Sequence, residues 1–187
     1  MRYLVPTLLA LWSLPALAAT EHSVDPATGL ATWQTETRGI QVRLTQISPD
    51  QANAFYQARG FSAEAAAHYT EQCVFMTVVR NVGAVPIEYR LADWRYRTEG
   101  QPARAIRSKA EWDQLWQRLD VNDPARIAFG WAQIPATQVY APGDWNQGMT
   151  AYAVPRGARF DLDFTWQVGD RQLSGTLEQV QCADEHR

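Results

Sequence analysis

The sequence predicts a mainly β fold, an antiparallel β-sandwich with short helical insertions, and three observations support this prediction. Residues 160–168 alternate apolar and polar side chains, which is the pattern of a strand with one buried face. Residues 73–79 are apolar and largely β-branched at odd and even positions alike, as in a strand buried on both faces. Glycines and prolines typical of turns recur between such runs along much of the chain, as they do in β-sandwiches.

The first part of the chain is expected to combine two strands with two short helices. Residues 40–45 alternate apolar and polar side chains as a half-buried strand does, and residues 30–34 form a shorter strand before them. Ser48 can cap a helix near 49–59, because a glutamine three residues later completes a capping box. A second short helix is expected near 63–71.

A third helix is expected near 109–119. Ser108 supplies its cap, and four large apolar side chains follow at the spacing i, i+3, i+4 and i+7, which indicates an amphipathic helix lying on the sheet. Residues 123–134 either form another helical segment, with Ile127 and Trp131 facing inward together, or continue as extended chain.

The remaining sequence predicts further strands. Residues 87–97 are expected to form one strand. The last third of the chain adds four more, expected at 138–141, 149–154, 160–168 and 173–182. Gly169 and Asp170 suit a two-residue hairpin turn between the last two strands.

The chain is expected to consist of a leader and one domain. Residues 1–19 have a positive start, an apolar run and small residues before a cleavage point at Ala18 or Ala19, as in a secretory signal peptide. Residues 20–29 are polar without periodicity and are expected to form a flexible arm. Residues 30–187 then form a single β-sandwich domain of ordinary size. The mature protein is therefore expected to be soluble and periplasmic.

Two cysteines, Cys73 and Cys182, are expected to form a disulfide, because an exported chain meets an oxidising compartment. The alternative is a redox or metal role. It is disfavoured because the sequence has no Cys-x-x-Cys motif and no histidine next to either cysteine.

Composition argues against several classes of function. The formal net charge is −3 at pH 7, so no general attraction to nucleic acid or anionic membranes is expected. The apolar run of the leader is too short for a bilayer span, and no cysteine follows the cleavage region to carry a lipid anchor. The three histidines are scattered and no Gly-x-Ser-x-Gly motif occurs, so the chain is not expected to be an enzyme.

A copper site at the mature N-terminus is the alternative function. If cleavage follows Ala19, Thr20 supplies a free amine and His22 stands third. The amine, two backbone amides and the imidazole can then form a square-planar site for Cu(II) or Ni(II). Cleavage after Ala18 places His22 fourth and removes this chelate.

Two surfaces are candidate partner-binding sites. Arg95 and Arg97 belong to a group of arginines with few opposing carboxylates, and such a strip can receive an acidic partner or form local ion pairs. Asp144, Trp145 and Asn146 form the tip of a loop, where sandwich domains commonly carry recognition residues. The alternative is that this tryptophan is buried and closes the end of the sandwich.

The segment from Cys73 onward resembles periplasmic or secreted immunoglobulin-like domains. Four short phrases are similar to a group of uncharacterised exported proteobacterial proteins: Pro49-Asp50-Gln51, Ala58-Arg59-Gly60-Phe61, Arg126-Ile127-Ala128-Phe129 and Pro142-Gly143-Asp144-Trp145. This resemblance implies export and an immunoglobulin-like sandwich, and it implies no activity. We therefore expect a non-enzymatic accessory module that binds another exported protein.

Overall fold

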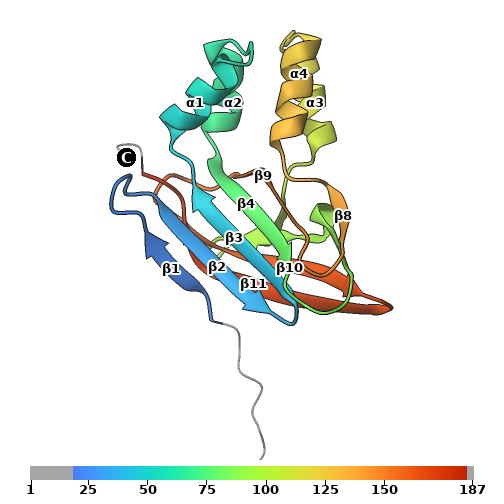
Figure 1. Cartoon of the computed structure of the whole chain (residues 1–187). Helices are drawn as coiled ribbons and strands as arrows, with labels where there is room; N and C mark the ends of the chain where they lie inside the picture. The colour runs from blue at the N-terminus through green and yellow to red at the C-terminus, as the bar shows by residue number, and fades with distance from the viewer. Residues whose placement is uncertain (1–18, 185–187) are drawn as a thin grey trace, which may run out of the picture.

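Two antiparallel β-sheets face each other around the larger of two hydrophobic cores (Figure 1). The computed structural model describes residues 19–184, so the expected signal peptide lies outside the described residues except for Ala19. The five-stranded sheet has the order β1–β2–β3–β4–β9. Its strands are β1 (Glu21–Val24), β2 (Ala31–Thr37), β3 (Ile40–Gln46), β4 (Cys73–Asn81) and β9 (Trp145–Tyr152).

The six-stranded sheet is built around β10. β11 pairs along one edge of β10, while β6 and β5 pair with its other edge. β7 then pairs with β6, and β8 pairs with β5. The strands are β5 (Ile87–Arg90), β6 (Arg95–Arg97), β7 (Arg104–Ala105), β8 (Thr137–Tyr140), β10 (Arg159–Val168) and β11 (Arg171–Gln181).

The expected single strand over 87–97 is interrupted by a 3-10 turn, η1 (Leu91–Asp93). Tyr89 before the turn and Leu91 at its first position are buried, and Trp94 and Tyr96 are buried after it. Side chains of a continuous strand alternate between its two faces, so residues 91 and 94 would face opposite sides. The turn shifts the alternation of side chains by one residue, so that all four side chains enter the core.

The two sheets confirm the antiparallel β-sandwich, but their strand order does not confirm an immunoglobulin topology. β1 to β4 follow one another across a single sheet, as in a meander, before the chain crosses to the other sheet. Immunoglobulin-like domains instead distribute their strands between two sheets through Greek-key connections.

The segment 20–29, expected to be a flexible arm, instead contains the edge strand β1. All four of its residues pair with β2, from Glu21 opposite Gln34 to Val24 opposite Ala31. All four are also exposed, so backbone pairing and not burial holds the strand. A strand without a buried face has no apolar alternation, which explains why the sequence pattern did not reveal it.

Four helices form two hairpins that project from one end of the sandwich (Figure 1). They are α1 (Pro49–Gln57), α2 (Ala63–Thr70), α3 (Lys109–Arg118) and α4 (Asp123–Ala132). The helices expected near 49–59, 63–71 and 109–119 correspond to α1, α2 and α3, and capping boxes at Ser48 and Ser108 begin α1 and α3.

A second hydrophobic core joins the hairpins to the outer face of β4 and β9. Aromatic side chains fill the space between the hairpins: the ring centroids of Tyr69 and Trp112 are 5.0 Å apart, and those of Phe61 and Trp116 are 5.2 Å apart. The buried residues of this core are Tyr56, Phe61, Ala65, Ala66, Tyr69, Val74, Trp112, Trp116, Ala125, Phe129, Met149 and Ala151.

The chain leaving α4 crosses β9 in direct backbone contact. Ile134 donates its N–H to the carbonyl oxygen of Met149 at 3.2 Å, and Gln133 forms a parallel bridge with the same residue. A Cβ atom at position 148 would overlap the backbone of residues 133 and 134. Gly148 is therefore required by this close approach.

A disulfide between Cys73 and Cys182 connects the two sheets, as the sequence predicts. Cys73 begins β4 and Cys182 directly follows β11, with a sequence separation of 109 residues. Within residues 19–184, no helix has the length and apolar character needed to cross a membrane.

Replacing both cysteines by alanine should lower the free energy of unfolding by about 4–5 kcal/mol, because the cross-link no longer restricts the unfolded chain. Urea unfolding of the double variant and of the oxidised protein measures the difference. Chemically reduced wild-type protein should match the variant, and a loss below about 1 kcal/mol would contradict the expectation.

Gly148→Ala should destabilise the fold by about 2 kcal/mol or more, because two backbone segments must move apart. Gly130→Ala is the matched control. It lies in α4, where its Cβ would make ordinary contacts with Lys109 Cε at 3.6 Å and Nζ at 3.7 Å, so it should stabilise the protein by about 0.5–1 kcal/mol. Equal effects in the two variants would disprove the crossing at position 148.

Candidate functional site

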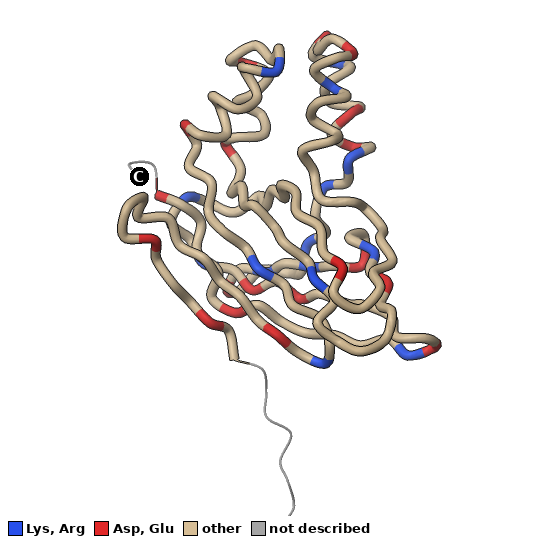
Figure 2. The backbone as a smooth tube through the Cα atoms, viewed as in Figure 1, with Lys and Arg blue, Asp and Glu red and all other residues tan. Residues whose placement is uncertain are grey.

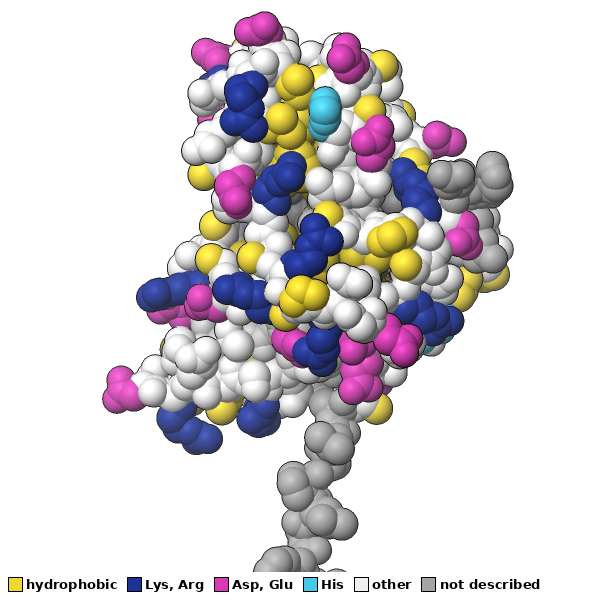
Figure 3. Space-filling view, turned by 180° about the vertical axis from the view of Figure 1, so that it is seen from behind, with side chains coloured by type: hydrophobic (Ala, Val, Ile, Leu, Met, Phe, Trp, Pro, Cys, Tyr) yellow, Lys and Arg dark blue, Asp and Glu magenta, His cyan; other side chains and the backbone are white. Residues whose placement is uncertain are grey.

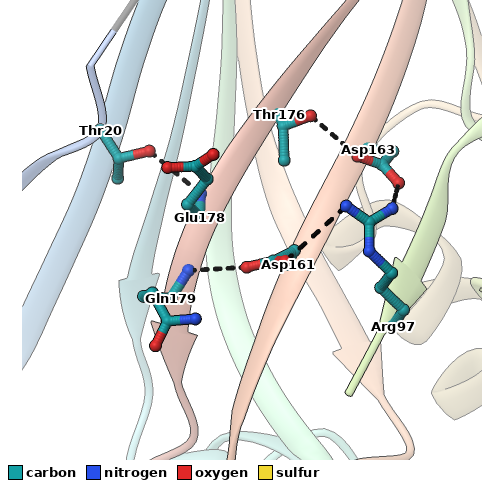
Figure 4. Close-up of polar contacts among 7 residues, drawn as sticks. All are labelled: Thr20, Arg97, Asp161, Asp163, Thr176, Glu178 and Gln179. Atoms are coloured by element: carbon teal, nitrogen blue, oxygen red, sulfur yellow. Dashed lines mark hydrogen bonds and ion pairs between the residues drawn. The ribbon is translucent and has the colours of Figure 1, made fainter. Parts of the chain in front are cut away.

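The arginines predicted to bind an acidic partner are engaged in contacts within the chain, and Figure 4 shows those of Arg97. Arg97 on β6 pairs with Asp163 and lies 3.7 Å from Asp161, both on β10. Arg95 donates from Nη1 to two backbone carbonyl oxygens in and just after η1, at 2.6 and 2.8 Å. Figure 2 shows acidic and basic residues interspersed over the molecule. These contacts match the alternative of local ion pairs, and partner binding through the two arginines stays a prediction.

A β-bulge in β11 fixes the start of the described chain (Figure 4). Gln179 has a φ of 55°, and its N–H donates to Asp161 at 2.9 Å. The N–H of Glu178 donates to Thr20 Oγ1 at 3.0 Å. Thr20 and Asp161 thus satisfy two donors at the bulge, where regular ladder pairing is interrupted.

The residues expected to bind copper lie in or beside β1. The His22 ring is 4.9 Å from the ring of Trp33, and His22 is paired with that residue across β1 and β2. A square-planar chelate must wrap the first peptide units around the ion, which requires β1 to leave the sheet. Between residues 19 and 184, no three His, Cys, Asp or Glu side chains are grouped to hold a metal. The N-terminal copper site stays a prediction.

Of the residues expected at a loop tip, only Asp144 lies in a loop, because Trp145 and Asn146 already belong to β9 and pair with β4. Asn81 holds this junction of loop and strand in place. This fully buried residue donates from its side-chain amide to carbonyl oxygens of two neighbouring segments, at 2.8 and 3.0 Å. Its backbone N–H donates to the carbonyl oxygen of Asp144 at 2.9 Å. Trp145 is 56% exposed, so it does not close the end of the sandwich. Its contact with a partner stays a prediction.

Helix α4 is apolar on two opposite faces. Ala125 and Phe129 are buried against the other helices, whereas Ile127 and Trp131 are 61% and 87% exposed. The expectation that Ile127 and Trp131 face inward is therefore wrong. Both pairs are four residues apart and fit a helical stripe equally well, so periodicity alone did not distinguish them.

The exposed pair belongs to a shallow apolar groove between α1 and α4. Phe55 forms the α1 wall together with Arg59, whose guanidinium lies 3.4 Å from the Phe55 ring centroid. The lining residues are Phe55, Arg59, Pro124, Ile127, Ala128, Trp131 and Ala132. We call this the α1/α4 groove. The sequence did not identify Trp131 as a surface residue. The one available signal was the small side chain of Ala125, which suits the face of α4 that is packed closely against other helices.

A buried polar network holds the end of α4 that carries Trp131. Gln133 donates to the Tyr56 hydroxyl at 2.9 Å and accepts from the Tyr69 hydroxyl at 3.0 Å. Tyr56 donates in turn to Met149 Sδ at 3.2 Å. Burial raises the pKa of Tyr56 and Tyr69 well above the ordinary value. Both hydroxyls therefore stay protonated and act as donors.

Comparisons of the chain with protein-family models, with curated proteins and with solved structures find no match. The resemblance drawn from short sequence phrases thus stays an expectation.

Stability should fall as pH rises above about 10, because the folded chain keeps buried tyrosines protonated while the unfolded chain releases their protons. The raised pKa values of Tyr56, Tyr69 and Tyr152 all have burial as their largest cause. Each such tyrosine adds a slope of about 1.4 kcal/mol per pH unit up to its folded pKa. Urea unfolding across this pH range measures the slope.

Tyrosinate absorbance supplies the second readout. The signal of the buried tyrosines should develop together with unfolding. Complete ionisation of every tyrosine in protein that is still folded would contradict the burial of these hydroxyls.

Proposed function

We propose that this chain is a non-enzymatic periplasmic module that binds another exported protein, and that the α1/α4 groove is its contact surface. The exposure of Trp131, 87%, carries the proposal. Of the seven tryptophans in residues 19–184, five are buried and only Trp131 and Trp145 are exposed. Leaving a large apolar side chain in water forgoes about 1.5–3 kcal/mol of burial energy, and tryptophan is enriched among residues that dominate binding.

The support beneath the groove favours binding without rearrangement. Phe129, on the opposite side of α4 from Trp131, contacts Tyr56 and Trp116 with ring centroids 5.4 and 5.2 Å away. Gln133, which directly follows α4, fixes the end of this helix through hydrogen bonds with two tyrosine hydroxyls. A preorganised surface loses less conformational entropy on binding than a mobile one.

The shape and charge of the groove indicate the kind of segment it receives. It lies between two helices and is lined mainly by apolar side chains, which suits the apolar face of a partner helix. Arg59 donates to the carbonyl oxygen of Phe55 at 2.8 Å and has no carboxylate partner among the described residues. We therefore expect an acidic residue at the edge of that face.

The compartment and the finer fold type belong to the same proposal. The leader-like residues 1–19 support export, and the disulfide fits an oxidising compartment such as the periplasm. The immunoglobulin-like type of sandwich rests on the resemblance from Cys73 onward.

Trp131→Ala should abolish capture of the partner from periplasmic extract without affecting the fold. Binding of the purified partner should weaken about tenfold or more, because truncating a central tryptophan of an interface typically costs about 2 kcal/mol or more. Its free energy of unfolding should stay within about 0.5 kcal/mol of wild type, because the side chain is exposed.

Trp145→Ala is the matched control, since it makes the same change at the other exposed tryptophan. It should retain the partner. Loss of the partner in Trp145→Ala alone would overturn the assignment to the α1/α4 groove and favour the surface around Trp145. Undiminished binding in both variants would overturn both surfaces.

A further inference from the structure

A cavity of about 310 Å³ lies where the two hydrophobic cores meet. Leu91, Ile106 and Ile134 line it from the sandwich core, and Met149 and Ala151 line it from the core beneath the hairpins. All five side chains are buried. The cavity shares no residue with the α1/α4 groove.

The polar side chains that line the interior, Thr150 and Gln133, already have hydrogen-bond partners. Thr150 Oγ1 lies 2.6 Å from Thr77 Oγ1 and 3.2 Å from the Tyr152 hydroxyl. Gln133 is occupied by its two tyrosine partners. A ligand must therefore be apolar along the part that enters and can carry polar atoms only at the entrance.

The entrance combines small exposed side chains with positive charge. Ala92, Ala105 and Ala136 are exposed lining residues, so the cavity reaches the surface beside them. Arg107 and Lys109 line the same rim, and neither has an ion-pair partner in the described chain. Figure 3 shows Lys and Arg side chains next to apolar surface on the face opposite to that of Figure 1.

The one carboxylate among the lining residues is committed to capping α3. Glu111 accepts from the N–H and the hydroxyl of Ser108 at 2.8 and 2.7 Å. Arg107 is held by Trp112, whose ring centroid is 4.5 Å from its guanidinium carbon. Lys109 is the only lysine of the sequence, and its flexible ammonium group can reach a ligand head at the rim.

We propose that this cavity binds a small apolar carboxylate, with the apolar part inside and the carboxylate at Arg107 and Lys109. An engineered cavity of about 150 Å³ holds benzene, so this one has room for roughly a dozen non-hydrogen atoms. Pockets of this kind are typically apolar with few polar groups that fix orientation. Decanoate has the required size and charge.

Calorimetric titration of the purified oxidised protein with decanoate and with 1-decanol tests the proposal. Decanoate should bind with one-to-one stoichiometry and protect Lys109 from amine-modifying reagents. Lys109→Gln and Arg107→Gln should each weaken decanoate about tenfold, because a charge-assisted hydrogen bond is lost, and should leave 1-decanol unchanged. Arg118→Gln, at the far end of α3, is the matched charge control and should bind both as wild type does.

Ala151→Leu fills the cavity and should abolish binding of both probes. Ala136→Trp at the exposed rim serves the same purpose if the buried variant fails to fold. Trp131→Ala should bind decanoate normally, since the groove is separate. Absence of decanoate binding, or binding at several sites that persists in the filled variants, would overturn the proposal.

Discussion

The fold depends on β4 being buried on both faces. Phe75 and Val79 point into the sandwich core, whereas Val74 and Val78 point to the opposite face, where Val74 joins the core beneath the hairpins. One strand thus forms a wall of two hydrophobic cores. Both ends of β4 carry a further constraint, with the disulfide at Cys73 and the loop-binding Asn81 at its other end. A change that shifts the register of this strand would move residues of both cores at once.

The helical hairpins give the sandwich a rigid surface that a plain sandwich lacks. Their aromatic side chains pack mainly against each other, and this leaves one apolar face of α4 without a partner in the described chain. On its inner side, the segment after α4 lines the cavity through Gln133 and Ile134. The two proposed sites are therefore lined by consecutive parts of the chain, α4 for the groove and the residues after it for the cavity.

Several features were predictable because they depend on local pattern. The two capping boxes, the alternating strand at 160–168, the doubly buried strand at 73–79 and the cysteine pair each have a sequence signal that tertiary structure preserves. Other features depend on what packs against an element. The choice between the Ala125 and Ile127 faces of α4 and the shift of side-chain alternation at η1 are set by neighbours distant in the sequence, so no local pattern encoded them. The same reason explains why Trp131 was assigned to the core and why Trp145 was expected in a loop although it begins β9. Strand β1 lacked a pattern for another reason, since none of its residues is buried.

The position of the disulfide also constrains the order of events during synthesis. All of β5 to β11, α3 and α4 lie between the two cysteines, so the ribosome must add 109 residues after Cys73 before its partner exists. Until then Cys73 is a lone thiol, and any oxidation it undergoes must involve another molecule. Correct pairing therefore requires either that this thiol stay reduced until almost the whole domain has been made, or that a disulfide formed earlier with another molecule be exchanged afterwards.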